Sequence, residues 1–282
     1  MLTMSHHLIL QHPHIEQCDL SALQTLVAAP PMRVNERVMR YSVADTLVLP
    51  NAVIDVLNQQ QIDYALLPER HFAELGLIVS DMDSTLITIE CIDEIAAGVG
   101  LKEQVAEITE QSMRGELDFE QSLRRRVALL KGLHEDVLQD VYDHVLQLSA
   151  GAEYLIHECK QHDVKFMLVS GGFTFFTERL KARLGLDYAY ANVLKIENGI
   201  LTGELEGRII DAQAKADLLV QHRDELGLQP EQVLAMGDGA NDIPMLQAAG
   251  IGVAYHAKPK ARQFADVCIN HQGLEAVRAC FL

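Results

Sequence analysis

Two acidic residues with one residue between them, Asp81 and Asp83, are the side chains in this sequence best suited to chemistry. They follow the apolar run at 75–80, which predicts a short buried strand. Open α/β sheets place their active sites in the loops at the carboxyl ends of such strands. At this spacing one carboxylate can attack an electrophile or bind a metal ion while the other transfers a proton. A solvated acidic turn would also fit this pair taken alone.

A second acidic loop of the same construction lies near the other end of the chain. Residues 232–236 are typical of another buried strand, and the loop at 237–242 follows directly, with Asp238, Asn241 and Asp242. Two acidic loops, each at the end of a buried strand, favour an active site over a solvated turn.

A third predicted strand, at 164–169, ends in a group of small residues. Ser170 and Gly171 follow it and lead into a helical pattern. A hydroxyl, bare backbone amides and a helix N-terminus together form an anion-binding site. Lys215 lies in the opening turns of another predicted helix, where a surface position is the ordinary interpretation of a lone lysine.

The ordered set of DMDST, VSGGF, a helix lysine and GDGAND resembles the four motifs of the haloacid dehalogenase superfamily of phosphotransferases. The flanking sequence looks like the phosphoserine phosphatase branch of that superfamily. The resemblance runs from about Leu75 to the end of the sequence, about three quarters of the chain. Four motifs in order are far more specific than any one of them.

The resemblance implies a covalent mechanism. Asp81 would attack the phosphorus of a phosphomonoester and form an aspartyl phosphate, and Asp83 would protonate the leaving oxygen and later activate water. Mg²⁺ would be held by Asp81, by the backbone carbonyl of Asp83 and by Asp238.

The remaining motif residues are implied to hold the phosphate. Lys215, Ser170 and the amide of Gly171 would bind its equatorial oxygens. Asn241 resembles a second phosphate contact. Asp242 resembles either an outer metal ligand or an acid that orients the lysine.

A helical stretch at about 88–149 directly follows the nucleophile loop and is expected to form a cap that excludes bulk water. Within it the resemblance assigns Arg126 to the substrate carboxylate and Glu90 to the substrate ammonium. Met113 and Phe119 align with apolar residues that cover the substrate, and a structural role in the cap core fits them equally well.

The expected fold is α/β: a doubly wound, mostly parallel sheet with the helical cap and a small α/β module at 1–72, followed by the phosphatase domain at 73–282. An Asn-Gly pair at 198–199 predicts a β-hairpin. In the module we expect strands and helices in the following places: strands at 8–10, 33–43 and 64–67; helices at 19–28 and 52–60. Relatives can carry amino-acid-binding regulatory domains there, and homodimer contact or docking would serve equally well.

Composition fits an enzyme that handles a small molecule. Lys and Arg total 23 against 40 Asp and Glu in 282 residues, a net charge of −17, which disfavours nucleic acid and anionic membranes as partners. Five cysteines without CxxC spacing fit a reducing compartment. No apolar run approaches the ~20 residues of a membrane span, and no signal peptide is evident, so a cytoplasmic location is expected.

Other interpretations of the glycine-rich loops fit the chemistry less well. The loop at 237–242 begins like a dinucleotide fingerprint, but Asp238 would face the pyrophosphate. The segment at 81–86 begins like a calcium loop and lacks its glycine. A GxxxxGK[ST] P-loop is absent from the sequence.

The resemblance therefore implies hydrolysis of O-phospho-L-serine to serine and phosphate, the last step of phosphorylated serine synthesis. Phosphoryl transfer from phosphoserine to another alcohol, such as homoserine, would use the same intermediate. A non-catalytic amino-acid sensor is the alternative from another class, and the intact set of Asp81, Asp83, Lys215 and Asp238 argues against it.

Overall fold

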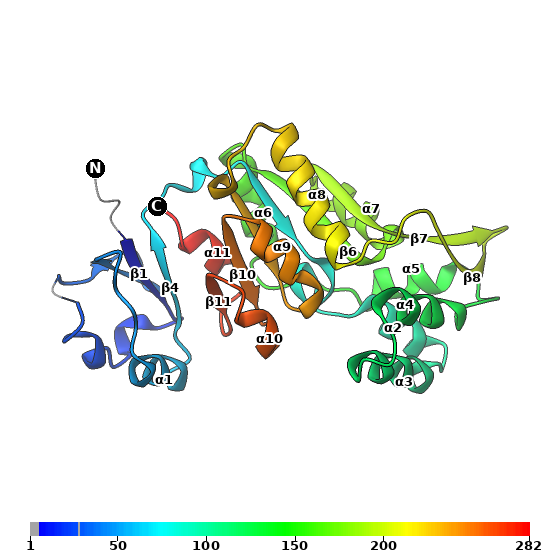
Figure 1. Cartoon of the computed structure of the whole chain (residues 1–282), viewed down its shortest axis with the longest axis horizontal. Coiled ribbons are helices and arrows are strands. Elements are labelled where there is room, and N and C mark those ends of the chain that lie inside the picture. The colour runs from blue at the N-terminus through cyan, green and yellow to red at the C-terminus, as the bar shows by residue number, and fades with distance from the viewer. Residues whose placement is uncertain (1–5, 28) are drawn as a thin grey trace.

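The computed structural model describes residues 6–27 and 29–282, which form one eleven-stranded sheet with helices on its faces (Figure 1). The strands are β1 His6–Gln11, β2 Met32–Arg33, β3 Val38–Val43, β4 Asp63–Pro68, β5 Leu77–Ser80, β6 Lys165–Phe173, β7 Tyr188–Glu197, β8 Ile200–Glu206, β9 Val233–Gly237, β10 Ile251–Tyr255 and β11 Val267–Ile269. Their order across the sheet is β2-β3-β1-β4-β11-β10-β9-β5-β6-β7-β8.

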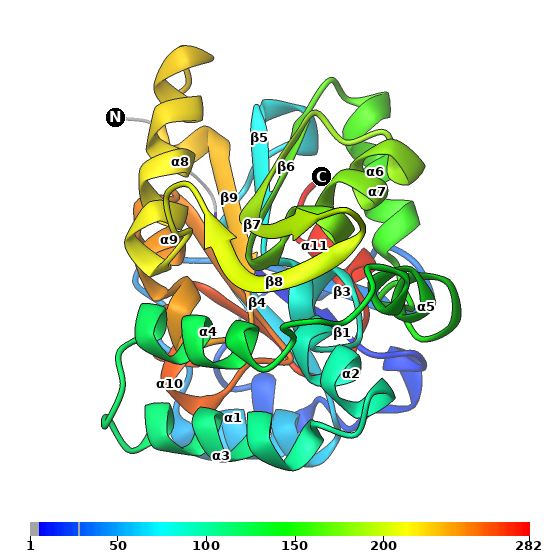
Figure 2. The same ribbon diagram turned by 90° about the vertical axis from the view of Figure 1, so that its right-hand side faces the viewer.

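The centre of the sheet, from β11 to β7, is parallel and carries helices on both faces (Figure 2). The α-helices are α1 Asn51–Gln59, α2 Cys91–Gly98, α3 Lys102–Met113, α4 Phe119–Ala128, α5 Asp136–His144, α6 Ala152–Gln161, α7 Thr174–Leu184, α8 Ala212–Glu225, α9 Ile243–Ala248, α10 Pro259–Arg262 and α11 Glu275–Ala279. Alternate residues of β5 point to opposite faces of the sheet and pack into different cores. Leu77 and Val79 belong to the core that contains Leu219 of α8 and Met245 of α9, and Ile78 belongs to the larger core on the other side. The doubly wound, mostly parallel fold is confirmed.

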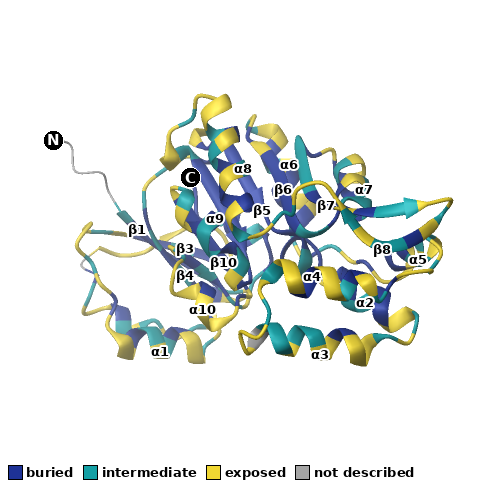
Figure 3. Cartoon of the chain, turned by 45° about the vertical axis from the view of Figure 1, so that its right-hand side comes forward, coloured by how far each residue is buried: buried dark blue, intermediate teal, exposed yellow. Residues whose placement is uncertain are grey.

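Helices α2 to α5 stand together at the carboxyl ends of the parallel strands, next to the β7–β8 hairpin (Figure 1). Asn198 and Gly199 have φ values of 52° and 79° at the tip of that hairpin, as an Asn-Gly turn requires. The outward faces of α3 and α4 are largely exposed (Figure 3), which is the pattern of helices that pack through one face only.

The N-terminal strands extend the same sheet, because β4 pairs antiparallel with β11 through Ala65↔Val267. The predicted strands at 8–10 and 64–67 and the predicted helix at 52–60 are confirmed as β1, β4 and α1. The helix predicted at 19–28 is wrong: the structure has only a short 3-10 turn at Ser21–Leu23, and residue 28 lies outside the described part. The predicted strand at 33–43 is divided into β2 and β3 by a turn.

Among the described residues, no helix is both long and apolar enough to cross a membrane.

Candidate active site

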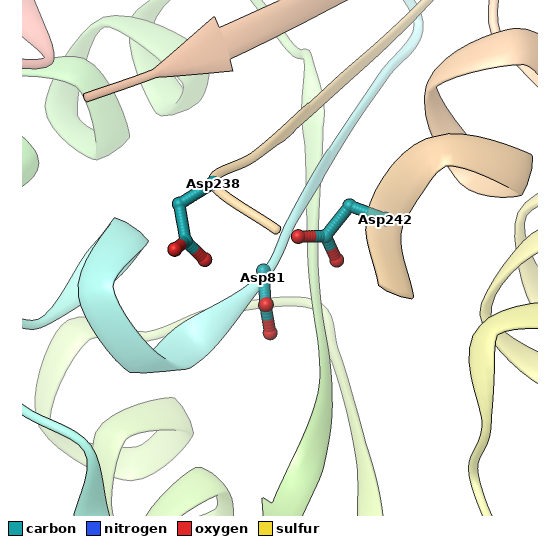
Figure 4. A group of neighbouring side chains, drawn as sticks. All are labelled: Asp81, Asp238 and Asp242. Atoms are coloured by element: carbon teal, nitrogen blue, oxygen red, sulfur yellow. The ribbon is translucent and has the colours of Figure 1, made fainter. Parts of the chain in front are cut away.

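Three neighbouring strands bring the sequence motifs to one edge of the sheet. β5 pairs with β9 on one side and with β6 on the other, all parallel. Asp81 directly follows β5, Asp238 directly follows β9, and Ser170 lies in the last residues of β6. Figure 4 shows the carboxylates of Asp81, Asp238 and Asp242 converging from these loops.

Lys215 is buried between two of these carboxylates. Its Nζ lies 2.8 Å from Asp81 Oδ1 and 2.8 Å from Asp242 Oδ1, and the lysine is 1% exposed. Burial alone would lower the pKa of Lys215, but Asp242 and Asp81 outweigh it and raise this pKa above the ordinary value. The lysine is therefore a fixed buried cation, and a surface role is ruled out.

Asp81 experiences opposing influences. Burial raises the pKa of Asp81 and the carboxylate of Asp242 raises it further, whereas Lys215 lowers it. Asp81 Oδ1 also accepts a hydrogen bond of 2.6 Å from the amide of Met82. The ionised form of Asp81 thus depends on the ammonium of Lys215 and on any cation bound at this edge.

Asp242 is placed to orient the lysine. Its Oδ1 pairs with Lys215 and its Oδ2 accepts a 3.0 Å hydrogen bond from the amide of Gly239. A Cβ at Gly237 would collide with this carboxylate, so the glycine lets the side chain pack against the backbone. Of the two roles considered from the sequence, the contact with Lys215 fits the lysine-orienting one, and the place of Asp242 beside Asp81 and Asp238 fits the metal-ligand one.

Asp83 has different surroundings from Asp81. Its Oδ1 accepts a hydrogen bond of 3.0 Å from the amide of Cys91 at the start of α2. Burial, followed by the negative charge of Glu90, raises the pKa of Asp83 to about 7. A Cβ at Gly172 would lie 2.9 Å from Asp83 Oδ2, so this glycine makes room for the carboxyl group.

The serine–glycine loop faces the same space. Ser170 is fully buried, and its Oγ accepts a 2.8 Å hydrogen bond from the amide of Gly172, so its own proton is free to donate. Asn192 Nδ2 donates to the carbonyl of Gly171 at 2.9 Å and fixes the loop backbone. The loop belongs to an irregular end of β6, where the pairing with β7 shifts between Val169 and Phe173.

A cavity of about 240 Å³ lies between these loops and the cap. Its lining includes the following residues predicted from the sequence: Asp81, Asp83, Glu90, Phe119, Arg126, Gly171, Asp238 and Asn241. Lys215, Ser170 and Asp242 are not part of this lining and lie buried beside it. Met113 ends α3, and its side chain lies outside the described part of the structure.

The three successive arginines of α4 separate as helix geometry requires. Arg124 pairs with Glu120 at 2.7 Å on the exposed face, whereas Arg126 lines the cavity. Burial lowers the pKa of Arg126, while Asp93 and Glu90 raise it. Glu90 is exposed and accepts a 2.8 Å hydrogen bond from the hydroxyl of Ser84.

Several lining residues were not predicted from the sequence: Ile92, Thr109, Leu123, Gly172, Phe173 and Lys258. Gly172 and Phe173 continue the VSGGF motif, so that motif could have indicated them. Lys258 follows β10, and its Nζ lies 3.5 Å from Asp238 Oδ2. Its place after another parallel strand is the signal that could have found it.

Asp81, Asp238 and Asp242 each offer an oxygen, and these oxygens lie within 4.8 Å of one another. Carboxylate oxygens of this kind are the ligands that Mg²⁺ and Ca²⁺ take. Burial raises the pKa of Asp238 to about 6, with Lys258 acting against the rise, and a bound cation would favour its ionised form. The cluster therefore fits a divalent cation.

Residues 78–247 match the family model of the haloacid dehalogenase-like hydrolases, and the chain belongs to this family. More specifically, a phosphoserine phosphatase from Polaromonas sp. is 50% identical over 213 residues, which cover 74% of this chain and 90% of the relative. This places the chain in the phosphoserine phosphatase branch.

Two solved structures are similar over nearly the whole chain. A HAD family hydrolase from Salmonella enterica serovar Typhi has a TM-score of 0.89 at 33% identity and covers 99% of both chains. A probable phosphoserine phosphatase from Vibrio cholerae, in its unliganded form, has a TM-score of 0.82 at 36% identity, covering 98% of this chain and 86% of that one. The similarity therefore extends over the N-terminal strands.

Proposed function

We propose that this protein hydrolyses O-phosphoserine to serine and phosphate, the last step of serine biosynthesis, through an aspartyl phosphate on Asp81. One observation carries the proposal: Asp81 and Asp83 open into the same cavity as Arg126 and Glu90. A nucleophile and a proton donor thus lie beside one cationic and one anionic side chain. Phosphoserine offers the matching groups, a phosphomonoester, a carboxylate and an ammonium.

In the first step, a carboxylate oxygen of Asp81 attacks phosphorus and the ester oxygen leaves with the proton of Asp83. A carboxyl group with a pKa of about 7 can carry that proton near neutral pH. Lys215, next to Asp81, and the amides of the glycine loop would stabilise the charge on the phosphoryl oxygens.

In the second step, Asp83 takes a proton from water, and the resulting hydroxide attacks the aspartyl phosphate. The P–O bond to Asp81 breaks, which restores the carboxylate and releases inorganic phosphate. Water must enter only at this stage, and the cap residues Phe119 and Leu123, which line the cavity, serve to exclude it earlier.

Mg²⁺ fits the acidic cluster, with Asp81, Asp238 and the backbone carbonyl of Asp83 as its proposed ligands. Bound there, it would supply positive charge that offsets the repulsion between the phosphate and Asp81. Asp242 would act on the site through Lys215.

Substrate selection would come from the cap. Arg126 is half-buried, so a substrate carboxylate would meet it in a poorly hydrated setting where charge-assisted hydrogen bonds are strong. Glu90 would accept from the substrate ammonium. The limited volume of about 240 Å³ fits a small amino-acid phosphate.

The test is a panel of phosphomonoesters assayed with magnesium: phosphoserine, phosphothreonine, phosphoethanolamine and glycerol phosphate. Phosphoserine should give the highest kcat/KM, and serine and phosphate should appear in equal amounts. The assay is repeated with added homoserine. A phosphorylated product at the expense of free phosphate would point to a phosphotransferase, and no preference for phosphoserine would contradict the substrate assignment.

A further inference from the structure

A second cavity, of about 510 Å³, lies where the N-terminal strands meet the C-terminal segment. Its walls come from β1 and β3, from the turn before β3, from α6, and from the segment 272–282 that includes α11. It contains none of the residues assigned above to the reaction. Its size is within the range of about 300–1,000 Å³ usual for small-molecule sites.

Arginines concentrate in this cavity, although the chain as a whole is strongly acidic at −17. Arg37, Arg40 and Arg278 line it, with Glu275 as the one acidic side chain of the lining. Arg278 already pairs with Glu158 at 2.9 Å, and Arg37 is 3.9 Å from Glu275. Among the described residues, these pairs leave Arg40 as the arginine of the lining without a carboxylate contact.

Arg40 is the most informative of these side chains, since it is 5% exposed. Its Nη2 donates to the backbone carbonyls of Ala279, at 2.9 Å, and Phe281. Its Nε is buried and has no hydrogen-bond partner among the described residues. Buried guanidinium groups are normally fully paired, because an unsatisfied charged donor is costly.

Burial lowers the pKa of Arg40 and the nearby Arg278 acts in the same direction, whereas Cys280 and Glu69 act against the change. The guanidinium keeps its charge at any ordinary pH. An anion that entered the cavity would therefore meet one guanidinium, that of Arg40, that is satisfied only by backbone carbonyls, and a second, that of Arg37, in a long ion pair. The apolar part of such a molecule would contact Val34, Val38 and Phe281, which also line the space.

We infer that this cavity binds a small organic anion, with its carboxylate or phosphate toward Arg37 and Arg40 and its apolar body against Val38 and Phe281. The inference is independent of the proposed phosphatase activity, because it rests on residues outside the catalytic cavity.

The test uses the full chain and three probes: benzoate, the uncharged benzamide of the same shape, and inorganic phosphate. Calorimetric titration measures affinity, and amide chemical shifts locate the site. Benzoate should bind at least about tenfold more tightly than benzamide, since the charge-assisted contact is lost in the amide. The amide signals of Val38, Ala279 and Phe281 should shift on binding.

Arg37→Gln is the main variant, because the side chain of Arg37 is 56% exposed and its ion pair with Glu275 is long, at 3.9 Å. It should weaken benzoate binding by roughly three- to tenfold. Arg33→Gln is the matched control, since Arg33 is also 56% exposed but does not line the cavity. Arg40→Gln is a second variant. If Arg40→Gln fails to fold, the result with Arg37→Gln alone tests whether the cavity binds the anion.

Equal affinities for benzoate and benzamide, or no saturable binding of benzoate, would overturn the inference. Shifts confined to Gly171 and Gly239 would overturn it as well, because they would place the anion in the catalytic cavity. Phosphate binding as tightly as benzoate at the same amides would refute the role given to the apolar wall.

Discussion

Asp81 and Asp83 are separated by one residue, and their surroundings give them different protonation chemistry. Asp81 lies 2.8 Å from the ammonium of Lys215, whereas Asp83 accepts a hydrogen bond from the neutral amide of Cys91 and lies near the negative charge of Glu90. Pairs of carboxyl groups whose environments differ in this way divide into nucleophile and acid.

The first prediction concerns this pair. Asp81→Asn should abolish turnover and the phosphorylated intermediate, because an amide of nearly the same shape is a poor nucleophile. Asp83→Asn should keep the hydrogen bond from Cys91 and bind phosphoserine, while turnover falls by roughly 10²–10⁴-fold because the leaving oxygen is no longer protonated. Steady-state kinetics and acid-quench detection of phosphoprotein measure both.

Near wild-type turnover by the Asp81→Asn variant would contradict the covalent mechanism. If Asp83→Asn lost substrate binding as completely as turnover, Asp83 would be a structural residue of the loop.

The second prediction concerns Arg126. Arg126→Ala should raise KM for phosphoserine by about ten- to hundredfold, the equivalent of a charge-assisted contact of about 1.5–3 kcal/mol. KM for phosphoethanolamine, which lacks the carboxylate, should change little. Arg124→Ala is the control, because Arg124 pairs with Glu120 on the exposed face of the same helix. Equal losses on both substrates would show that Arg126 does not read the carboxylate.

At the scale of elements, the strands of the site were predictable because each is a short, mostly apolar run that is followed by serine, glycine or acidic residues. The runs at 75–80, 164–169 and 232–236 correspond to β5, β6 and β9. Their adjacency in the sheet, and hence the meeting of their loops, follows from the parallel topology of α/β folds.

Two features of the structure were not predicted correctly. One depends on a local polar contact, and the other depends on a contact between distant segments. Asp19 accepts a hydrogen bond from the amide of Ser21, and this local turn replaces the predicted helix. Lys258 reaches the site only because β10 packs next to β9. The turn at Asp19 leaves no periodic signal, so period-based prediction could not find it, whereas Lys258 could have been found only from its place after a parallel strand.

Asp63, at the start of β4, connects this strand to a loop that is distant in the sequence. Its carboxylate is 2% exposed and accepts hydrogen bonds from the amides of Asn270, His271 and Gln272 at 2.8, 3.0 and 2.8 Å. The loop that it holds follows β11 and contributes Gln272 to the arginine-lined cavity. Asp63 thus fastens the N-terminal strands to the C-terminal segment.

The third prediction is that Asp63→Asn lowers the free energy of unfolding by about 1–3 kcal/mol, because its NH₂ group must then face at least one amide donor. Urea unfolding followed by circular dichroism measures the change. Asp55→Asn, at an exposed position of α1, should change stability by less than about 0.5 kcal/mol. Equal stabilities of the two variants would mean that the three amides are satisfied by water.

At the scale of the whole molecule, the N-terminal strands contribute to two cores. Ile9 and Leu67 belong to the large core that also holds Ile78 and Phe166 of the catalytic sheet. Leu8 and Leu10 belong to a separate core with Leu57 of α1. One face of the N-terminal strands therefore packs into the core of the catalytic sheet, and the other face packs into a separate core with α1.

The last prediction follows from this division between adjacent residues of β1. Ile9→Ala should lower the free energy of unfolding by about 2–5 kcal/mol, because it leaves a cavity in the shared core. Phosphatase activity and the circular dichroism signal should then both be lost at a lower urea concentration than in the wild type. Leu10→Ala removes a side chain that is equally buried, but from the separate core, so the urea midpoint of activity loss should fall less. If Ile9→Ala left that midpoint unchanged, the N-terminal strands would unfold without disturbing the catalytic sheet, and the pairing of β4 with β11 would carry no stability into the active site.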